Sequence, residues 1–231
     1  MKQLNRALIS TLPLFAGLSE DDLDFVLQDA RSFRVEKETA IFEQEGAAKS
    51  FYLLLHGHVR VERVTPDGHK IIVRYISEGE LLGIAMVMGR TAYPATAMAA
   101  VDCTVLEWPN TRWPLLAARI PSLAGNLVKT VGARLEDAHT RVVEMSTERV
   151  EQRVAHTILR LLKQTGRKVE DGVEIDFPIS RQDIAEMTGA TLFTISRILS
   201  EWETLGVVRG GRQKIIVTQP HRLLVIAEGR N

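Results

Sequence analysis

The 231-residue sequence has one cysteine and no surplus of charge of either sign. A single thiol, that of Cys103, cannot form a disulfide within the chain or supply the ligands of a four-thiolate zinc site or an iron–sulfur cluster. The 29 Lys and Arg residues balance the 29 Asp and Glu residues, so the protein has no net field that would attract nucleic acid or anionic lipid. Any such attraction must come from a local cluster of charge.

Long hydrophobic runs are also missing. The longest candidate for a membrane span, residues 81–101, is interrupted by Arg90 and Pro94. Lys2 and Arg6 precede an apolar stretch as in a signal peptide, but no Ala-x-Ala cleavage pattern follows, and acidic residues come directly after it. We therefore expect a cytoplasmic protein without membrane contact.

Glycines recur at intervals of 11 residues in the first half of the chain, at Gly46, Gly57, Gly68 and Gly79. The stretches between them are rich in β-branched and aromatic residues and lie at 51–55, 59–64 and 70–76. Regular spacing of short strands and turns is typical of a β-sandwich or β-roll. We expect the roll to end near residue 109.

A heptad pattern replaces the strand pattern further on. Apolar residues there are spaced alternately three and four apart, with polar residues between them, which predicts a coiled-coil helix. The stripe consists of Val128, Val131, Leu135, Ala138, Val142 and Met145. We expect it to form the seam of a parallel homodimer; the alternative is that it packs against the chain's own roll.

Residues 179–205 have the pattern of a helix-turn-helix. Ser180 and Asp183 form a capping-box sequence for the first helix. Gly189 suits the left-handed turn that ends this helix, and Thr191 caps the second. The buried stripe of the second helix is expected to be Ile195, Ile198, Leu199 and Trp202.

A β-hairpin, or wing, is expected after the helix-turn-helix, because two β-branched runs flank a turn at Gly210 and Gly211. A further helix is expected at 150–164 and a loop at 165–172. Residues 205–222 hold four basic residues and no acidic one, whereas 150–231 hold twelve basic and ten acidic residues. Phosphate contacts should therefore concentrate on the wing and the second helix.

The outward face of the second helix carries the residues that we expect to read DNA: Thr191, Leu192, Phe193, Ser196 and Arg197. Arg197 suits guanine, because a guanidinium donates to O6 and N7 together. Phe193 has two interpretations, contact with a thymine methyl group or packing against the neighbouring helix. The remaining expected DNA contacts are Ser180, Arg181, Arg209, Arg212 and Lys214.

Four segments in this order resemble the CRP/FNR superfamily of bacterial transcription regulators. They are LFAGLS at 14–19, FYLLLHGHV at 51–59, the heptad helix, and TISRIL at 194–199. The resemblance spans nearly the whole chain and implies an α+β fold. Its parts would be an N-terminal β-roll of the cyclic-nucleotide-binding, jelly-roll type at 1–111, a long dimerisation helix at 112–146 and a C-terminal winged helix-turn-helix at 147–231.

The same resemblance implies the partners. Family members are homodimers that bind palindromic operators in double-stranded DNA, and as transcription regulators they meet RNA polymerase. Members that bind cyclic nucleotides carry Gly-Glu for the ribose and Arg-Ser or Arg-Thr for the phosphate, where this chain has Gly83-Ile84 and Pro94-Ala95. A buried phosphate without a cation costs several kcal/mol, so we expect no cyclic AMP. Oxygen-sensing members need several cysteines, so we expect no iron–sulfur cluster.

The effector is left open by the sequence. The segment YPATA at 93–97, with nearby methionines, is similar to nitric-oxide-responsive members that are thought to use haem. The expected effector pocket consists of Gly83, Ile84, Met86, Met88, Tyr93, Pro94 and Ala95, and haem is one candidate ligand. The alternative is that the methionines fill gaps in the core of the roll.

An enzyme is the chief alternative function. His56, His58 and Glu62 have the spacing of the first metal motif of cupins, which are also β-rolls. Alternation argues against a metal site, because the apolar residues of these strands occupy odd positions and should leave the histidines and Glu62 outside. We therefore expect no metal and no catalysis. A cyclic-nucleotide-type sensor module without DNA binding is the other alternative, and it would lack the helix-turn-helix.

Overall fold

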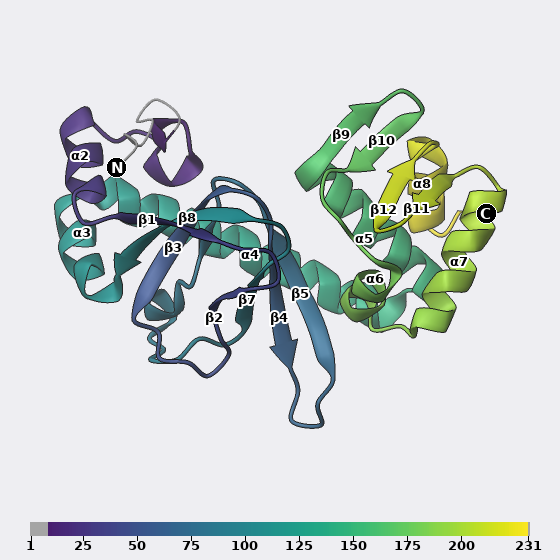
Figure 1. The fold of residues 1–231 in the computed structure, drawn as a ribbon, viewed down its shortest axis with the longest axis horizontal. Coiled ribbons are helices and arrows are strands. Elements are labelled where there is room, and N and C mark those ends of the chain that lie inside the picture. The colour runs from purple at the N-terminus through teal and green to yellow at the C-terminus, as the bar shows by residue number, and fades with distance from the viewer. Residues whose placement is uncertain (1–8, 231) are drawn as a thin grey trace. The chain divides into compact units, whose positions relative to one another are not determined.

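The computed structural model describes residues 9–230, which divide into two compact units (Figure 1). Within the described range, one unit holds residues 9–61 and 76–138, and the other holds 62–75 and 139–230. The expected α+β class is confirmed, with a sheet-rich N-terminal domain, a long helix and a C-terminal helix-turn-helix. Lys2 and Arg6 lie outside the described residues. No helix in the described range is long and apolar enough to cross a membrane.

Two four-stranded sheets build the roll. The first has the order β1-β8-β3-β6 and is formed by Arg31–Val35, Cys103–Pro109, Ser50–His56 and Leu81–Leu82. The second has the order β2-β7-β4-β5 and is formed by Ala40–Phe42, Thr96–Ala99, Val59–Val64 and Lys70–Ile76. Strands β3, β4 and β5 lie where the glycine spacing predicts them. The turn between β4 and β5 is closed by a hydrogen bond from the Thr65 amide to the His69 carbonyl, 2.9 Å long.

Short helices accompany the roll: η1 (Pro13–Phe15), α2 (Glu20–Leu27), η2 (Ala85–Met88), η3 (Asn110–Arg112) and α3 (Trp113–Arg119). The long helix α4 then runs over Pro121–Thr147. Near its start, the Asn126 amide group donates to the carbonyls of Leu14 and Ala16, at 3.0 and 2.9 Å. These bonds fasten the beginning of α4 to the N-terminal segment of its own unit.

An aromatic contact fixes one side of the roll's core. Trp108 of β8 is fully buried and stacks on Phe51 of β3, with ring centroids 5.3 Å apart. Its indole N–H donates to the Val26 carbonyl at 2.7 Å. An unpaired indole N–H in such a core costs about 1–3 kcal/mol, so this hydrogen bond holds α2 in a defined place on the sheet.

The expected exposure of Glu62 is wrong. Its side chain is buried, with 7% of the residue exposed, and its carboxylate lies 3.5 Å from the Lys70 ammonium group. Val59 belongs to an apolar cluster of the roll and Val61 packs against that cluster, so the odd positions of β4 face the core as expected, and the even position of Glu62 is covered as well. His56, by contrast, is exposed and pairs with Glu78 at 2.7 Å. No group of three His, Cys, Asp or Glu residues between 9 and 230 is placed to hold a metal ion.

The second unit contains the winged helix-turn-helix. Helix α5 spans Val150–Thr165, close to the expected bounds. The expected loop at 165–172 is wrong, because β9 (Gly166–Val169) and β10 (Gly172–Ile175) form a hairpin there. Strand β9 has no apolar alternation in its sequence, and ion pairs stabilise the hairpin instead. Arg167 of β9 lies 3.0 Å from Glu174 and 2.8 Å from Asp176.

The remaining elements are α6 (Arg181–Thr188), α7 (Leu192–Thr204), β11 (Val208–Gly211), β12 (Lys214–Val217) and α8 (Pro220–Ala227). The wing strands join the preceding hairpin in a sheet of order β11-β12-β10-β9. The turn of the wing was expected at Gly210 and Gly211, but both lie in β11, and Arg212 and Gln213 make the turn. The Glu203 carboxylate lies where a Cβ atom at Gly210 would be, so a larger residue there would displace this side chain. Helix α8 was not predicted.

Candidate DNA-binding site

The first helix of the helix-turn-helix begins and ends as its sequence predicts. The Ser180 hydroxyl accepts a hydrogen bond from the Asp183 amide at 3.1 Å, and the Asp183 carboxylate accepts one from the Ser180 amide at 2.7 Å. This reciprocal pair satisfies two backbone donors that the helix leaves free. At the other end, Gly189 adopts a left-handed conformation with φ of 63°, which turns the chain towards α7.

Helix α7 is held by its inner face. The Thr191 hydroxyl caps it by accepting a hydrogen bond from the Thr194 amide at 3.2 Å. The predicted stripe is buried throughout and comprises Ile195, Ile198, Leu199 and Trp202. The Trp202 indole N–H also donates to Glu151 of α5, at 3.1 Å. The opposite face of α7 is therefore presented from a rigid base.

The presented face carries one cation and one aromatic ring. The Arg197 side chain is 63% exposed and lies 3.9 Å from Glu201, one turn further along. Phe193 is 80% exposed, so its ring does not pack against a neighbouring helix of its own chain. Leu192 is exposed and Ser196 is half-buried. Phe193, Ser196 and Arg197 share a helix face because residues three and four apart are neighbours on a helix.

Ser180 and Arg181, both expected to contact DNA, already have partners within the chain. The Ser180 hydroxyl belongs to the capping box described above. The Arg181 guanidinium donates to the Glu203 carboxylate at 2.9 Å, to the Ser200 hydroxyl at 3.1 Å and to the Ser196 carbonyl at 3.3 Å. Arg181 thus braces α6 against α7, and its contact with DNA stays a prediction.

Acidic side chains neutralise part of the wing. Lys214 lies 2.7 Å from Glu174, a buried carboxylate that also binds Arg167. Arg209 pairs with Asp171. Arg212 is exposed at the turn of the wing. The sequence reveals neither acidic partner, because Asp171 and Glu174 lie 38 and 40 positions before the basic residues with which they pair.

The stripe of α4 is largely open to solvent. Val128, Leu135 and Val142 are 66%, 56% and 64% exposed. Ala138 and Met145 are also exposed, whereas Val131 packs against the core of its own roll. Val131 therefore packs against the roll, as the alternative expected. Val128, Leu135 and Val142 are exposed and free to pack against a partner helix.

The residues expected to form an effector pocket are distributed over two apolar clusters of the roll. Ile84 belongs to the same apolar cluster as Trp108, and Met86 packs against that cluster. Tyr93 belongs to the other cluster, where Phe42 stacks on it with ring centroids 4.0 Å apart. Met88 is exposed. Half-buried Pro94 and buried Ala95 directly follow Tyr93, and half-buried Gly83 precedes Ile84.

The second cluster is a closed set of aromatic contacts. The Tyr93 hydroxyl donates to the Ser50 carbonyl at 2.7 Å, and Phe42 also stacks on Tyr52, with ring centroids 5.7 Å apart. Burial, and then the Tyr93 hydroxyl, raise the pKa of Tyr52, so its phenol stays neutral. These rings occupy the interior of the roll beside β2, β3 and β7.

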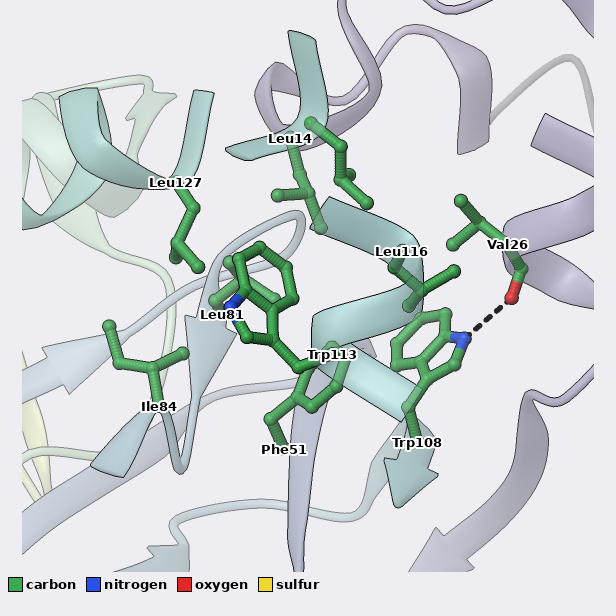
Figure 2. Close-up of a pocket in the computed structure, with 10 residues that line it drawn as sticks. Leu14, Val26, Phe51, Leu81, Ile84, Trp108, Trp113, Leu116 and Leu127 are labelled. Atoms are coloured by element: carbon green, nitrogen blue, oxygen red, sulfur yellow. Dashed lines mark hydrogen bonds between the residues drawn. The ribbon is translucent and has the colours of Figure 1, made fainter. Parts of the chain in front are cut away.

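A small cavity lies within the apolar cluster that contains Trp108 and Ile84, here called the first cluster. Figure 2 shows its apolar lining, with Phe51, Leu81, Ile84, Trp108 and Trp113 around it. Its volume is about 10 Å³, which is room for at most one water molecule. Small-molecule sites usually measure about 300–1,000 Å³. The cavity therefore fits neither a nucleotide nor a haem.

Both halves of the chain match known protein families. Residues 32–118 match the cyclic nucleotide-binding domain, and residues 152–226 match the Crp-like helix-turn-helix domain. The solved structure of FixK2 from Bradyrhizobium japonicum has a similar fold, with a TM-score of 0.75 at 24% identity, and the similarity covers 85% of this chain and 96% of that one.

Relatives over most of the length agree with the domain matches. The cyclic AMP receptor protein of Thermus thermophilus is 29% identical over 217 residues, which are 94% of this chain and 97% of that protein. The nitrogen fixation regulation protein FixK of Bradyrhizobium diazoefficiens is 30% identical over 194 residues, 81% of this chain and 78% of that protein. Regulators of this kind bind DNA, act as dimers and are not enzymes. The chain belongs to the CRP/FNR family of DNA-binding transcription regulators, with a sensor domain of the cyclic-nucleotide-binding type.

Proposed function

We propose that two copies of the chain bind one palindromic operator and that each places the outer face of α7 in the major groove. The observation that carries this proposal is the exposed Arg197 guanidinium on a helix whose inner stripe is buried and whose start is capped. A guanidinium held in this way can donate to both O6 and N7 of a guanine. Arg197 is therefore the principal base-reading residue of the proposal.

The exposed stripe of α4 supplies the pairing of the two copies. Parallel packing of Val128, Leu135 and Val142 on their counterparts buries side chains that one chain leaves in water. A two-fold axis along this seam makes the two α7 helices equivalent, so the operator must be a palindrome. Two α7 helices that bind one face of a duplex enter successive turns of the major groove, about 34 Å apart.

The wing supplies a small number of phosphate contacts. Arg212 stands at the exposed turn, while Lys214 and Arg209 share their charge with Glu174 and Asp171. Each phosphate contact adds about 0.9 to the slope of log affinity against log salt concentration. We therefore expect a shallower salt dependence than three unpaired basic residues per wing would give.

We infer that the roll's signal is not cyclic AMP. The family match concerns the domain, and the name of the Thermus relative describes that relative. In this chain, Ile84 and Ala95 are buried apolar residues at the positions where ribose and phosphate partners are needed. Calorimetric titration with cyclic AMP is expected to show no binding at micromolar concentrations, and measurable heats with a one-to-one stoichiometry would contradict the inference.

Haem is likewise not part of the proposal, because nothing among the described contacts favours it and the cavity beside Ile84 has room for at most one water molecule. Reconstitution with haemin is expected to give no Soret band beyond that of free haemin. The ligand or other signal that the roll answers is left to experiment. The bound dimer would act on RNA polymerase in the cytoplasm, where bacterial DNA lies.

Selection from random DNA tests the proposal most directly. The full-length protein is expected to enrich a palindrome whose half-site centres lie about one helical turn apart. Arg197→Ala should weaken binding to that site by about 1–3 kcal/mol and relax one symmetric position. Arg212→Ala is the matched control, because it should weaken binding to all sequences alike and lower the salt slope by about 1. Failure to enrich any site, or equal losses for both variants on random DNA, would overturn the proposal.

A further inference from the structure

Phe193 is 80% exposed, more than any other large apolar residue in the described part of the chain. Isolated apolar residues on a surface are ordinary, so exposure by itself assigns no role. Phe193, however, lies at the second position of α7, in the turn that Thr191 caps, and it shares its face with Arg197 one turn further on. A large ring is thus held at a fixed place beside the residue expected to read guanine.

We propose that Phe193 reads a thymine in each half-site through the C5-methyl group of that base. This inference rests on the proposed function of α7 and adds a second base to its specificity. The thymine methyl is the apolar feature that base pairs present in the major groove. A phenyl ring has no hydrogen-bonding atom, so of the groups on the base edges it favours this methyl.

The same ring would act against other bases at that position. A cytosine amino group or a guanine carbonyl facing the ring would lose water and gain no hydrogen bond in return. Specificity would therefore come both from contact with the methyl and from the cost of a polar group in its place. Arg197 would read the neighbouring guanine by hydrogen bonds, so the two residues would recognise adjacent bases by different chemistry.

The arrangement of neighbouring side chains supports contact with a base over contact with the backbone. Leu192, the adjacent residue, is also exposed and apolar, so the start of α7 presents two hydrocarbon side chains. Neither can bind a phosphate, and apolar contact in the groove is what they offer. Ser196 on the same face is small and half-buried, so it does not shield the exposed Phe193 ring.

The expected size of the effect follows from the burial of one methyl group. Removing a single buried methyl weakens an interaction by about fourfold. Because the operator is a palindrome, removing both symmetric methyl groups should weaken binding by about fifteenfold. Substitution of deoxyuridine for thymidine removes this group and leaves base pairing unchanged.

A thymine-to-uracil scan of the selected operator tests the proposal with the full-length dimer. Wild-type protein is expected to show one symmetric pair of positions at which uracil weakens binding by about fifteenfold. Phe193→Ala should bind the thymine and uracil versions of that pair equally. Leu192→Ala, a change to the neighbouring exposed residue, should keep the sensitivity of the wild type at the same pair. Phe193→Leu should keep part of it, because its side chain is still apolar.

Each outcome separates this inference from the proposed function. If no DNA site is enriched, the proposed function of α7 fails. If a palindrome is enriched but wild-type binding is indifferent to uracil at every position, the reading of thymine by Phe193 is wrong. The reading of thymine is also wrong if Phe193→Ala stays sensitive to uracil at the same pair of positions. It is wrong as well if Phe193→Ala binds DNA as the wild type does and loses only transcription activation, because that result would assign the ring to a protein partner. Circular dichroism of the variants checks that α7 is folded.

Discussion

Cys103, the one thiol of the chain, lies buried in strand β8. Its Sγ donates to the carbonyls of Val101 and His58, at 3.1 and 3.4 Å. Burial raises the pKa of this thiol. At neutral pH the side chain is therefore a small, protonated core residue, which makes it a poor nucleophile.

Thiol labelling checks this description. At pH 8 an aromatic disulfide reagent should react with Cys103 at least about a hundredfold more slowly in the native protein than in denaturant, since reaction requires local opening. Met88→Cys in a Cys103→Ala background is the control, because residue 88 is exposed and its thiol should react at once. Complete labelling of native wild-type protein during mixing would contradict the burial of Cys103.

The raised pKa also fixes a pH dependence. The thiol of the unfolded chain ionises near pH 8.5, while the buried thiol keeps its proton to higher pH. The unfolded state therefore binds fewer protons above that pH, and the free energy of unfolding should fall as pH rises through it. Cys103→Ala should remove this part of the pH dependence, which denaturant titrations between about pH 7 and 10 can measure.

Residue-scale contacts are also where the sequence is least informative. The sequence shows that basic residues concentrate near the wing. It does not show that Lys214 is paired with the buried Glu174. Arg181 looks like a free cation in the sequence and is bound to Glu203 on the next helix. Pairs of this kind join residues 22 and 40 positions apart, and no local pattern marks them.

At the scale of elements, local signals predict structure well where capping and packing agree. The helix-turn-helix has a capping box at Ser180, a left-handed turn at Gly189 and a buried stripe, and all three are present. Strand β9 was missed because it carries no apolar alternation and is stabilised by ion pairs of Arg167. Helix α8 was missed because it is only eight residues long, although Pro220 marks its start.

The cap of α6 offers a stability test. Ser180→Ala removes the hydroxyl that accepts from the Asp183 amide and donates to the Asp183 carboxylate, while the Ser180 amide keeps its bond to that carboxylate. Loss of such a cap costs about 1 kcal/mol. Ser146→Ala is the control, because the exposed Ser146 hydroxyl, in the last turn of α4, only bonds back to the Val142 carbonyl, and such a bond does not stabilise a helix, so this change should be neutral or slightly stabilising. The thermal unfolding midpoint of Ser180→Ala should therefore lie below that of Ser146→Ala. Equal midpoints would show that the cap adds nothing to stability.

For the whole molecule, the sequence predicts the family architecture because its signals recur over nearly the full length of the chain. It cannot predict how the roll's interior is filled, since contacts such as Phe42 on Tyr93 join strands far apart in sequence. The heptad stripe of α4 is partly predictable from the sequence. Its spacing is local, but whether it meets its own roll or a partner depends on surroundings that differ along the helix, as Val131 and Leu135 show.

Leu135 provides the test of assembly, because it lies in the middle of the exposed stripe. Leu135→Asp would replace two leucines at the two-fold seam with two facing carboxylates. The loss of apolar burial alone is worth about 1.5–3 kcal/mol per leucine, and unpaired carboxylates at a seam add the cost of their desolvation. We expect the dimer to dissociate at micromolar concentration, with the mass measured by sedimentation falling from two chains to one and affinity for the palindrome falling with it. Ala133→Asp places the same charge on an exposed position on the other side of α4, so it should leave both mass and affinity unchanged. A Leu135→Asp protein that still sediments as a dimer would show that the copies pair elsewhere.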